Sequence, residues 1–351
     1  MRYVPFLKFK GNEVGALKEL PPFIKSKIIP FFDIPRDDEL TSETLNKKVC
    51  TAYRKYELHM QDLPAFYLDN YDIDDDIKIS GHNNYKFIID VFSKSSFIPV
   101  IGLDRSAERI RCVFESRGAG EISSDVIAIR LTEADFISWR LIQDDIETLM
   151  NDCVRYFSNV HLIIDNRVCS SVSASSRAEK INLLINELVS RYHFEYIICT
   201  GSIIPASMSD LIGTGKVGFF QRNEINIYNL LKNAHPAIVF GDYTVVSPLY
   251  SDVNIPKKVL QKVMAPKILY SFDDQLHISR GHALESHPRG AKQYNDMAVD
   301  LVSKAFFRKA PYSWGDNFIV DKSLMRGKNV TPNSIIKPLV NAHITFVFNT
   351  I

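Results

Sequence analysis

Charged or polar residues end eight short apolar runs in this chain of 351 residues. Most of them are aspartates, and carboxylates brought together repel one another unless a cation, a proton or a basic side chain joins them. Carboxylate oxygens suit Mg²⁺ or another hard cation, whereas lysine and arginine suit a phosphate or a carboxylate. The terminal residues are Lys8, Asp33, Asp69, Asp104, Arg130, Asp165, Thr200 and Asp242.

The apolar runs predict strands whose carboxyl ends meet. They are rich in Ile, Val, Phe and Tyr, and amphipathic stretches such as 141–157 and 175–192 predict helices between them. Strands that alternate with helices favour a parallel sheet, and eight units favour an α/β, TIM-like (β/α)₈ barrel. An open doubly wound sheet uses the same elements and is the alternative. The runs cover 3–8, 28–33, 65–69, 97–104, 125–130, 161–165, 196–200 and 237–242.

Alternation along each strand predicts which side chains face the inside of the barrel. If each terminal residue faces inward, the residue two positions before it faces inward as well. In this register apolar side chains fill the barrel and a charged ring lies at its carboxyl mouth. The apolar residues predicted to face inward are Phe6, Phe31, Tyr67, Val100, Ala128, Ile163, Ile198 and Phe240.

The charged ring predicts a site for chemistry. We expect Asp33, Asp165 and Asp242 to act as general base or as ligands of Mg²⁺ or Mn²⁺, with Lys8 and Arg130 holding anionic oxygens. The competing interpretation is structural, because aspartate at a strand end often caps the following loop or helix.

The pattern changes after residue 246. We therefore divide the chain into a barrel, 1–246, and a C-terminal extension, 247–351, which packs over the mouth and is not an independent domain. A helix is predicted at 293–307 and a final strand at 341–348. We expect Arg280 and the backbone at Gly281 to bind an anion. We expect Tyr243, Trp314 and Asp316 to bind a ligand that contains a ring.

Composition excludes several classes of protein. Lys and Arg number 42 against 41 Asp and Glu, so a generally basic surface that coats nucleic acid is not expected. No apolar run is long enough for a membrane helix. The five cysteines are spread along the chain without a C-x-x-C pair, which favours a reducing, cytoplasmic setting.

Several segments resemble the family known as "beta protein" in phage and bacterial genomes. The chain departs from the family pattern at Asp33, where glutamate is expected, and at Ala342, where a second histidine is expected beside His343. The resemblance lies in residues 3–8, 15–17, 29–35, 241–243, 280–281, 293–294, 313–316 and 341–347.

The resemblance implies a role in phage–host conflict but no particular reaction. Its tail residues would complete one site with Lys8 and the aspartates if the tail folds over the mouth. We expect the protein to bind a nucleotide or a nucleic acid. We also expect it to hydrolyse this ligand, as a phosphodiesterase or nuclease does. The alternative is a non-catalytic sensor that recognises a phage component and works with a partner protein from the same locus. The tail residues are Arg280, Gln293, Trp314, Asp316 and His343, the last as a catalytic group.

Overall fold

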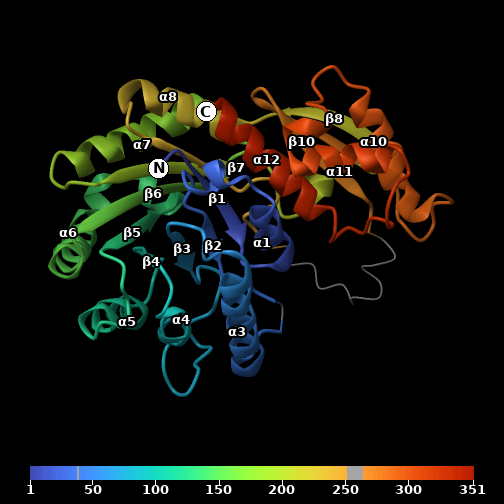
Figure 1. Cartoon of the computed structure of the whole chain (residues 1–351). Helices are drawn as coiled ribbons and strands as arrows, with labels where there is room; N and C mark the ends of the chain where they lie inside the picture. The colour runs from blue at the N-terminus through green and yellow to red at the C-terminus, as the bar shows by residue number, and fades with distance from the viewer. Residues whose placement is uncertain (38, 251–263) are drawn as a thin grey trace.

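The computed structural model describes residues 1–37, 39–250 and 264–351 and contains a closed barrel of eight parallel strands (Figure 1). The strands follow one another around the barrel in chain order, which confirms the predicted fold class. They are β1 (Tyr3–Lys8), β2 (Phe31–Asp33), β3 (Phe66–Asp69), β4 (Phe97–Ile101), β5 (Val126–Leu131), β6 (Asn159–Val168), β7 (Tyr196–Ser202) and β9 (Val239–Asp242).

Helices cover the outside of the barrel. The amphipathic stretches predicted at 141–157 and 175–192 form α6 and α7, and the apolar stripe of α6, including Ile142, Ile146 and Leu149, is buried. Among the described residues no helix is both long and apolar enough to cross a membrane. The helices up to the last strand are α1 (Gly11–Lys18), α2 (Pro22–Lys25), α3 (Ser42–His59), α4 (Asn84–Phe92), α5 (Ala107–Gly118), α6 (Trp139–Tyr156), α7 (Ala174–Val189) and α8 (Asn223–Ala234).

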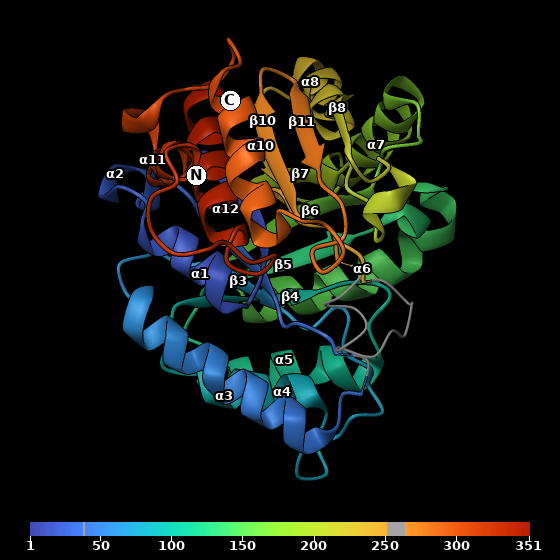
Figure 2. The same ribbon diagram turned by 90° about the vertical axis from the view of Figure 1, so that its right-hand side faces the viewer.

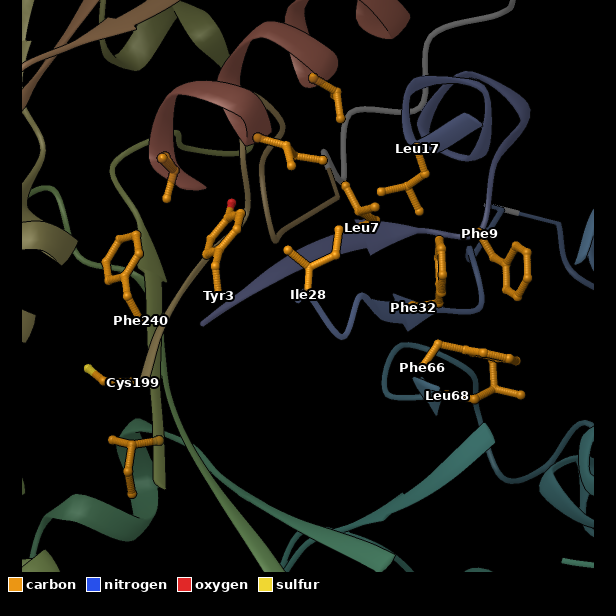
Figure 3. Close-up of a cluster of buried hydrophobic side chains, with 14 of the residues drawn as sticks. Tyr3, Leu7, Phe9, Leu17, Ile28, Phe32, Phe66, Leu68, Cys199 and Phe240 are labelled. Carbon is orange, nitrogen blue, oxygen red and sulfur yellow. The ribbon is translucent and has the colours of Figure 1, made fainter. Parts of the chain in front are cut away.

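Two apolar clusters lie on opposite sides of the strands. Figure 3 shows part of the outer cluster, in which Tyr3 and Phe240 lie between the barrel wall and the helices. The inner cluster matches the predicted register on seven strands. It consists of Val4, Phe6, Phe31, Tyr67, Ile98, Val100, Ala128, Ile163, Ile198, Val239 and Tyr243.

The predicted register of the last strand is wrong by one residue. Val239 and Tyr243 face inward, so Phe240 and Asp242 face outward. Gly241 lies inside between them, where an added Cβ would meet the Phe6 ring at 2.9 Å. The bulk of Phe6 thus occupies the space that a side chain on this strand would otherwise fill.

A small antiparallel sheet stands beside the barrel (Figure 2). Its strand order is β10 (Lys267–Phe272), β11 (Gln275–Arg280) and β8 (Lys216–Gln221), so it pairs segments from both sides of the predicted division at residue 246. The helices α10 (Gln293–Val302) and α11 (Trp314–Ser323) pack against one another, and α10 contacts β10.

The predicted final strand at 341–348 is wrong, because these residues belong to the helix α12 (Ile336–Thr350). This helix contacts α1, α11, β1 and β10, and every residue from Pro338 to Phe348 is buried. Asn341, His343 and Thr345 alternate with apolar residues and so produce the period-two pattern of a strand. All three are nevertheless buried in the helix, where they form hydrogen bonds. In Figures 1 and 2, α12 lies between the barrel and the small sheet.

Gly315 sets how closely α11 and α12 approach each other. A Cβ at this position would lie 2.0 Å from the Pro338 carbonyl oxygen and 2.8 Å from the Ala342 nitrogen. We predict that Gly315→Ala lowers the free energy of unfolding by about 1–3 kcal/mol, because the two backbones must separate. Urea denaturation measures the change.

The control is Gly118→Ala in α5, where an added Cβ meets only a ring carbon of Tyr156 at 3.6 Å. This variant should be as stable as the wild type or slightly more stable. Equal stability of the two variants would contradict the proposed close approach.

Candidate functional site

Arg130 lies at the centre of the charged ring and is fully buried. Its Nη1 donates to Asp33 at 2.9 Å and to Asp69 at 2.8 Å. Its Nε and Nη2 donate to Asp165 at 3.0 and 2.7 Å, and Nη2 also donates to the Tyr243 hydroxyl at 2.8 Å. All five N–H groups of a guanidinium are accounted for by these bonds. The predicted convergence is therefore present, but Arg130 has no N–H group left for a ligand.

The three carboxylates around Arg130 are likewise held by protein groups. Arg105 donates to Asp69 at 2.8 Å, and the Arg167 backbone N–H donates to Asp165 at 2.8 Å. Although burial opposes it, Arg105 and Arg130 lower the pKa of Asp69. Burial raises the pKa of Asp33 to about 6, with Arg130 acting in the opposite direction.

This closed ring does not match the metal site that the sequence predicts. Asp33 and Asp165 both bind Arg130, and Asp242 faces the other side of the barrel wall. In the part of the chain that the structure describes, no group of three or more His, Cys, Asp and Glu side chains is placed to hold a metal ion. Tyr243, expected to stack on a ligand, is buried and donates its hydroxyl proton to Asp165 at 2.5 Å.

Asp242 and His343 form a second buried cluster outside the wall. His343 Nε2 lies 2.8 Å from Asp242, and His343 Nδ1 lies 2.7 Å from the Ser271 hydroxyl. Tyr3 and Arg222 also donate to Asp242, and His343 and Arg222 lower its pKa although burial opposes them. Ser271, His343 and Asp242 are hydrogen-bonded in the order found in a catalytic triad, but none of the three exposes more than 2% of its surface. The cluster joins α12 and β10 to the barrel.

The other tail residues make contacts within the tail and its neighbouring loops. Arg280 donates to the Ile212 carbonyl, and Gln293 accepts from the His282 backbone at 2.9 Å. A Cβ on Gly281 would meet Gln293 at 2.7 Å, so this glycine permits close packing.

Trp314 and Asp316 also serve the packing of the tail. Trp314 receives the Lys337 ammonium over its ring at 4.4 Å, and Asp316 accepts from the Tyr270 hydroxyl. Within the described residues, the bonds and ring contacts of the tail residues do not reach Lys8 or Arg130. The structure therefore does not assemble the composite site implied by the resemblance.

A rim above the closed ring contains residues that the sequence did not single out. Lys8 Nζ lies 3.3 Å from the centre of the Tyr250 ring, which Lys10 and Arg36 also face at 5.8 and 5.3 Å. Arg167 lies over the Tyr71 ring at 4.4 Å. Lys8 ends β1 and Arg167 lies near the end of β6, whereas the other rim residues lie outside the strands, so only the fold brings them together.

Lys8 and Arg167 are two cations of this rim with unused donors. Among the described residues, Lys8 Nζ has no hydrogen-bond or carboxylate partner, although the side chain is about nine-tenths buried. Arg167 pairs with Asp72 at 3.4 Å, and its buried Nη1 has no partner among the described residues. Burial and neighbouring Lys10 lower the pKa of Lys8 to about 8, with Asp72 and Asp33 opposing. The rim can therefore donate to an anion.

The ring around Arg130 predicts a large stability effect. Arg130→Met leaves three buried carboxylates without their cation, so we expect the free energy of unfolding to fall by about 3–5 kcal/mol. The loss should shrink at acidic pH, because protonation removes the unpaired charges. Urea denaturation at several pH values measures both effects.

Lys47→Met is the control, because it removes an exposed ion pair with Glu43 on α3. We expect it to cost less than about 0.5 kcal/mol. An equally small loss in Arg130→Met would contradict the role given to Arg130, and a variant that fails to fold would agree with it.

Comparisons with known proteins identify a family but no reaction. A family model described as "Beta protein" matches residues 3–349. No curated protein matches the chain. The crystal structure of triosephosphate isomerase from Bartonella henselae is 12% identical, with a TM-score of 0.34 over 69% of this chain and 92% of that chain. The barrel assignment rests on the closed strand order described above.

Proposed function

Because this chain belongs to the Beta protein family, whose name states no reaction, we propose its function from the mouth of the barrel. The protein binds a phosphate-bearing ligand, a nucleotide or a nucleic-acid end, at the rim above Arg130. The observation that carries this proposal is Lys8, a buried cation without a carboxylate partner among the described residues, with Arg167 nearby. A phosphate oxygen supplies the acceptor that such a cation lacks.

The rim residues contribute to binding in different ways. Lys8 and Arg167 Nη1 donate to phosphate oxygens, and Lys10 adds positive charge near Tyr250. Lys8, Lys10 and Arg167 lie together on the rim, where Asp72 pairs with Arg167 and Asp33 pairs with Arg130. An excess of cations in a partly desolvated site attracts an anion more strongly than the same charges would in water.

The closed ring favours binding without hydrolysis. Asp33, Asp69 and Asp165 are paired with Arg130 and are therefore not free to bind a metal ion. This geometry favours a binding protein over a metal-dependent phosphodiesterase or nuclease. This observation favours the second candidate function, a non-catalytic sensor in phage–host conflict that recognises a phage component and works with a neighbouring effector protein. Cleavage of a phosphodiester bond to an alcohol and a phosphomonoester with Mg²⁺ or Mn²⁺, lost in Asp33→Asn, would instead support the hydrolase.

Calorimetric titration with inorganic phosphate and with nucleotides tests the binding proposal. A charge-assisted hydrogen bond contributes about 1.5–3 kcal/mol, so Lys8→Met and Arg167→Met should each weaken binding by about 10- to 100-fold. Lys180→Met on α7 removes the same charge from an exposed position and should leave the affinity unchanged. Equal affinities in all variants would overturn the proposal.

Binding should also depend on pH through Lys8. Burial and Lys10 lower its pKa to about 8, with Asp72 and Asp33 opposing and Arg167 adding to the decrease. The cation is therefore lost as the pH rises through about 8, and we expect the affinity for a nucleotide to fall over that range. Lys8→Arg, which stays charged, should keep its affinity. A parallel decrease in both proteins would assign the effect to another group.

A further inference from the structure

We propose that the Lys8 amine is also a nucleophile, which condenses with the carbonyl group of a phosphate-bearing aldehyde or ketone to form an imine at the barrel mouth. The inference rests on the proposed function, because the same rim holds the phosphate. It adds a reaction and a substrate class to what would otherwise be a binding site. The argument depends on how Lys8 differs from the other buried lysines.

The other buried lysines of the described chain have their donors engaged. Lys25 pairs with Asp62 at 2.8 Å, and Lys322 donates to the carbonyl oxygens of Arg326 and Lys328 at 2.6 and 3.0 Å. Lys8 is buried to a similar degree, yet its Nζ has only the face of the Tyr250 ring as a close partner among the described residues. An amine without a carboxylate partner loses its proton more easily, and the neutral amine is the form that attacks a carbonyl.

The fold places Lys8 at the carboxyl end of the barrel. It is the last residue of β1 and follows Phe6 on the inward side, so its side chain rises from the barrel interior to the mouth. A rigid strand fixes the position of the amine better than a loop does. Arg167 and Lys10 remain available to hold a phosphate while the carbonyl end of the same molecule lies against Lys8.

Asp33 provides a group that can move protons beside the amine. It is the register partner of Lys8 on β2, and it also faces the mouth. Burial raises its pKa to about 6, so its carboxyl group exchanges a proton near neutral pH. Arg130 holds its Oδ1 at 2.9 Å and so fixes the orientation of the carboxyl group.

The reaction balances without an added oxidant or reductant. The nitrogen lone pair of Lys8 attacks the carbonyl carbon and forms a carbinolamine. The two amine hydrogens then leave with the carbonyl oxygen as one molecule of water, and a carbon–nitrogen double bond remains. Asp33 carries protons from the nitrogen to the departing oxygen. Water reverses the same steps and releases the ligand.

Trapping with a reductant tests the inference on the full-length protein. The probe is pyridoxal 5′-phosphate, which has an aldehyde and a phosphate, and sodium cyanoborohydride reduces any imine to a stable amine. Peptide mass spectrometry then locates the label. We expect Lys8 to be modified at least 10-fold faster than Lys10 or Lys180, and inorganic phosphate should slow its modification.

Two controls separate this inference from the proposed function. Lys8→Arg keeps the cation but cannot form an imine, so it should bind phosphate and lose the label at residue 8. Pyridoxal, which lacks the phosphate, should modify Lys8 of the wild type more slowly than its phosphate ester does.

The outcomes of these experiments are distinguishable. Modification of Lys8 no faster than that of Lys10, with phosphate binding intact, would overturn the imine and keep the binding function. Equal rates with both probes, together with no phosphate binding by the wild type, would overturn the binding function and leave a reactive amine. Thermal melting confirms that Lys8→Arg is folded before either result is interpreted.

Discussion

The contact of one buried guanidinium with three buried carboxylates determines what the mouth of this barrel can do. Arg130, from β5, bonds with Asp33, Asp69 and Asp165, which come from three other strands. Burying a charge costs several kcal/mol unless its partners satisfy it, and here every N–H group of Arg130 has an acceptor. Removing any one of these groups leaves the others uncompensated. The ring therefore connects the strands and leaves ligand binding to the rim residues, while Asp33 lies between the two as the register partner of Lys8.

The last barrel strand, β9, separates the ring around Arg130 from the outer cluster around Asp242. Tyr243 continues the inward side and joins the ring, whereas its neighbour Asp242 faces outward and binds Tyr3, Arg222 and His343. Alternation along the strand thus places adjacent residues on opposite sides of the wall. The outer cluster joins α12 to the barrel next to α1, and so it helps to close the ring of helices where the chain ends.

The sequence predicts the barrel and much of the ring, but it does not predict how the charges pair. Period-two alternation identifies the inward side on seven strands and fails on the eighth, because Gly241 is inward and carries no side chain to mark that side. The prediction for α12 fails for a different reason, because Asn341, His343 and Thr345 place a polar residue at every second position of a helix that is buried. The tail motifs led to the prediction of a ligand-binding site, but the same polar and aromatic residues also occur where segments pack against each other. Gln293 and Asp316 show that packing uses them here.

Lys8 differs from Arg130 and Arg167 at the mouth because no carboxylate among the described residues pairs with it directly. The nearest acid on the rim, Asp72, pairs with Arg167, and Asp33 pairs with Arg130. Two processes relieve such a charge: the amine releases its proton, or an anion binds beside it. A pKa near 8 keeps both forms of Lys8 populated at neutral to mildly alkaline pH, so one side chain can serve as a phosphate-binding cation and as a neutral nucleophile. The two roles are compatible within one ligand, because Arg167 and Lys10 continue to hold the phosphate after Lys8 has lost its proton and its neutral amine attacks the carbonyl group.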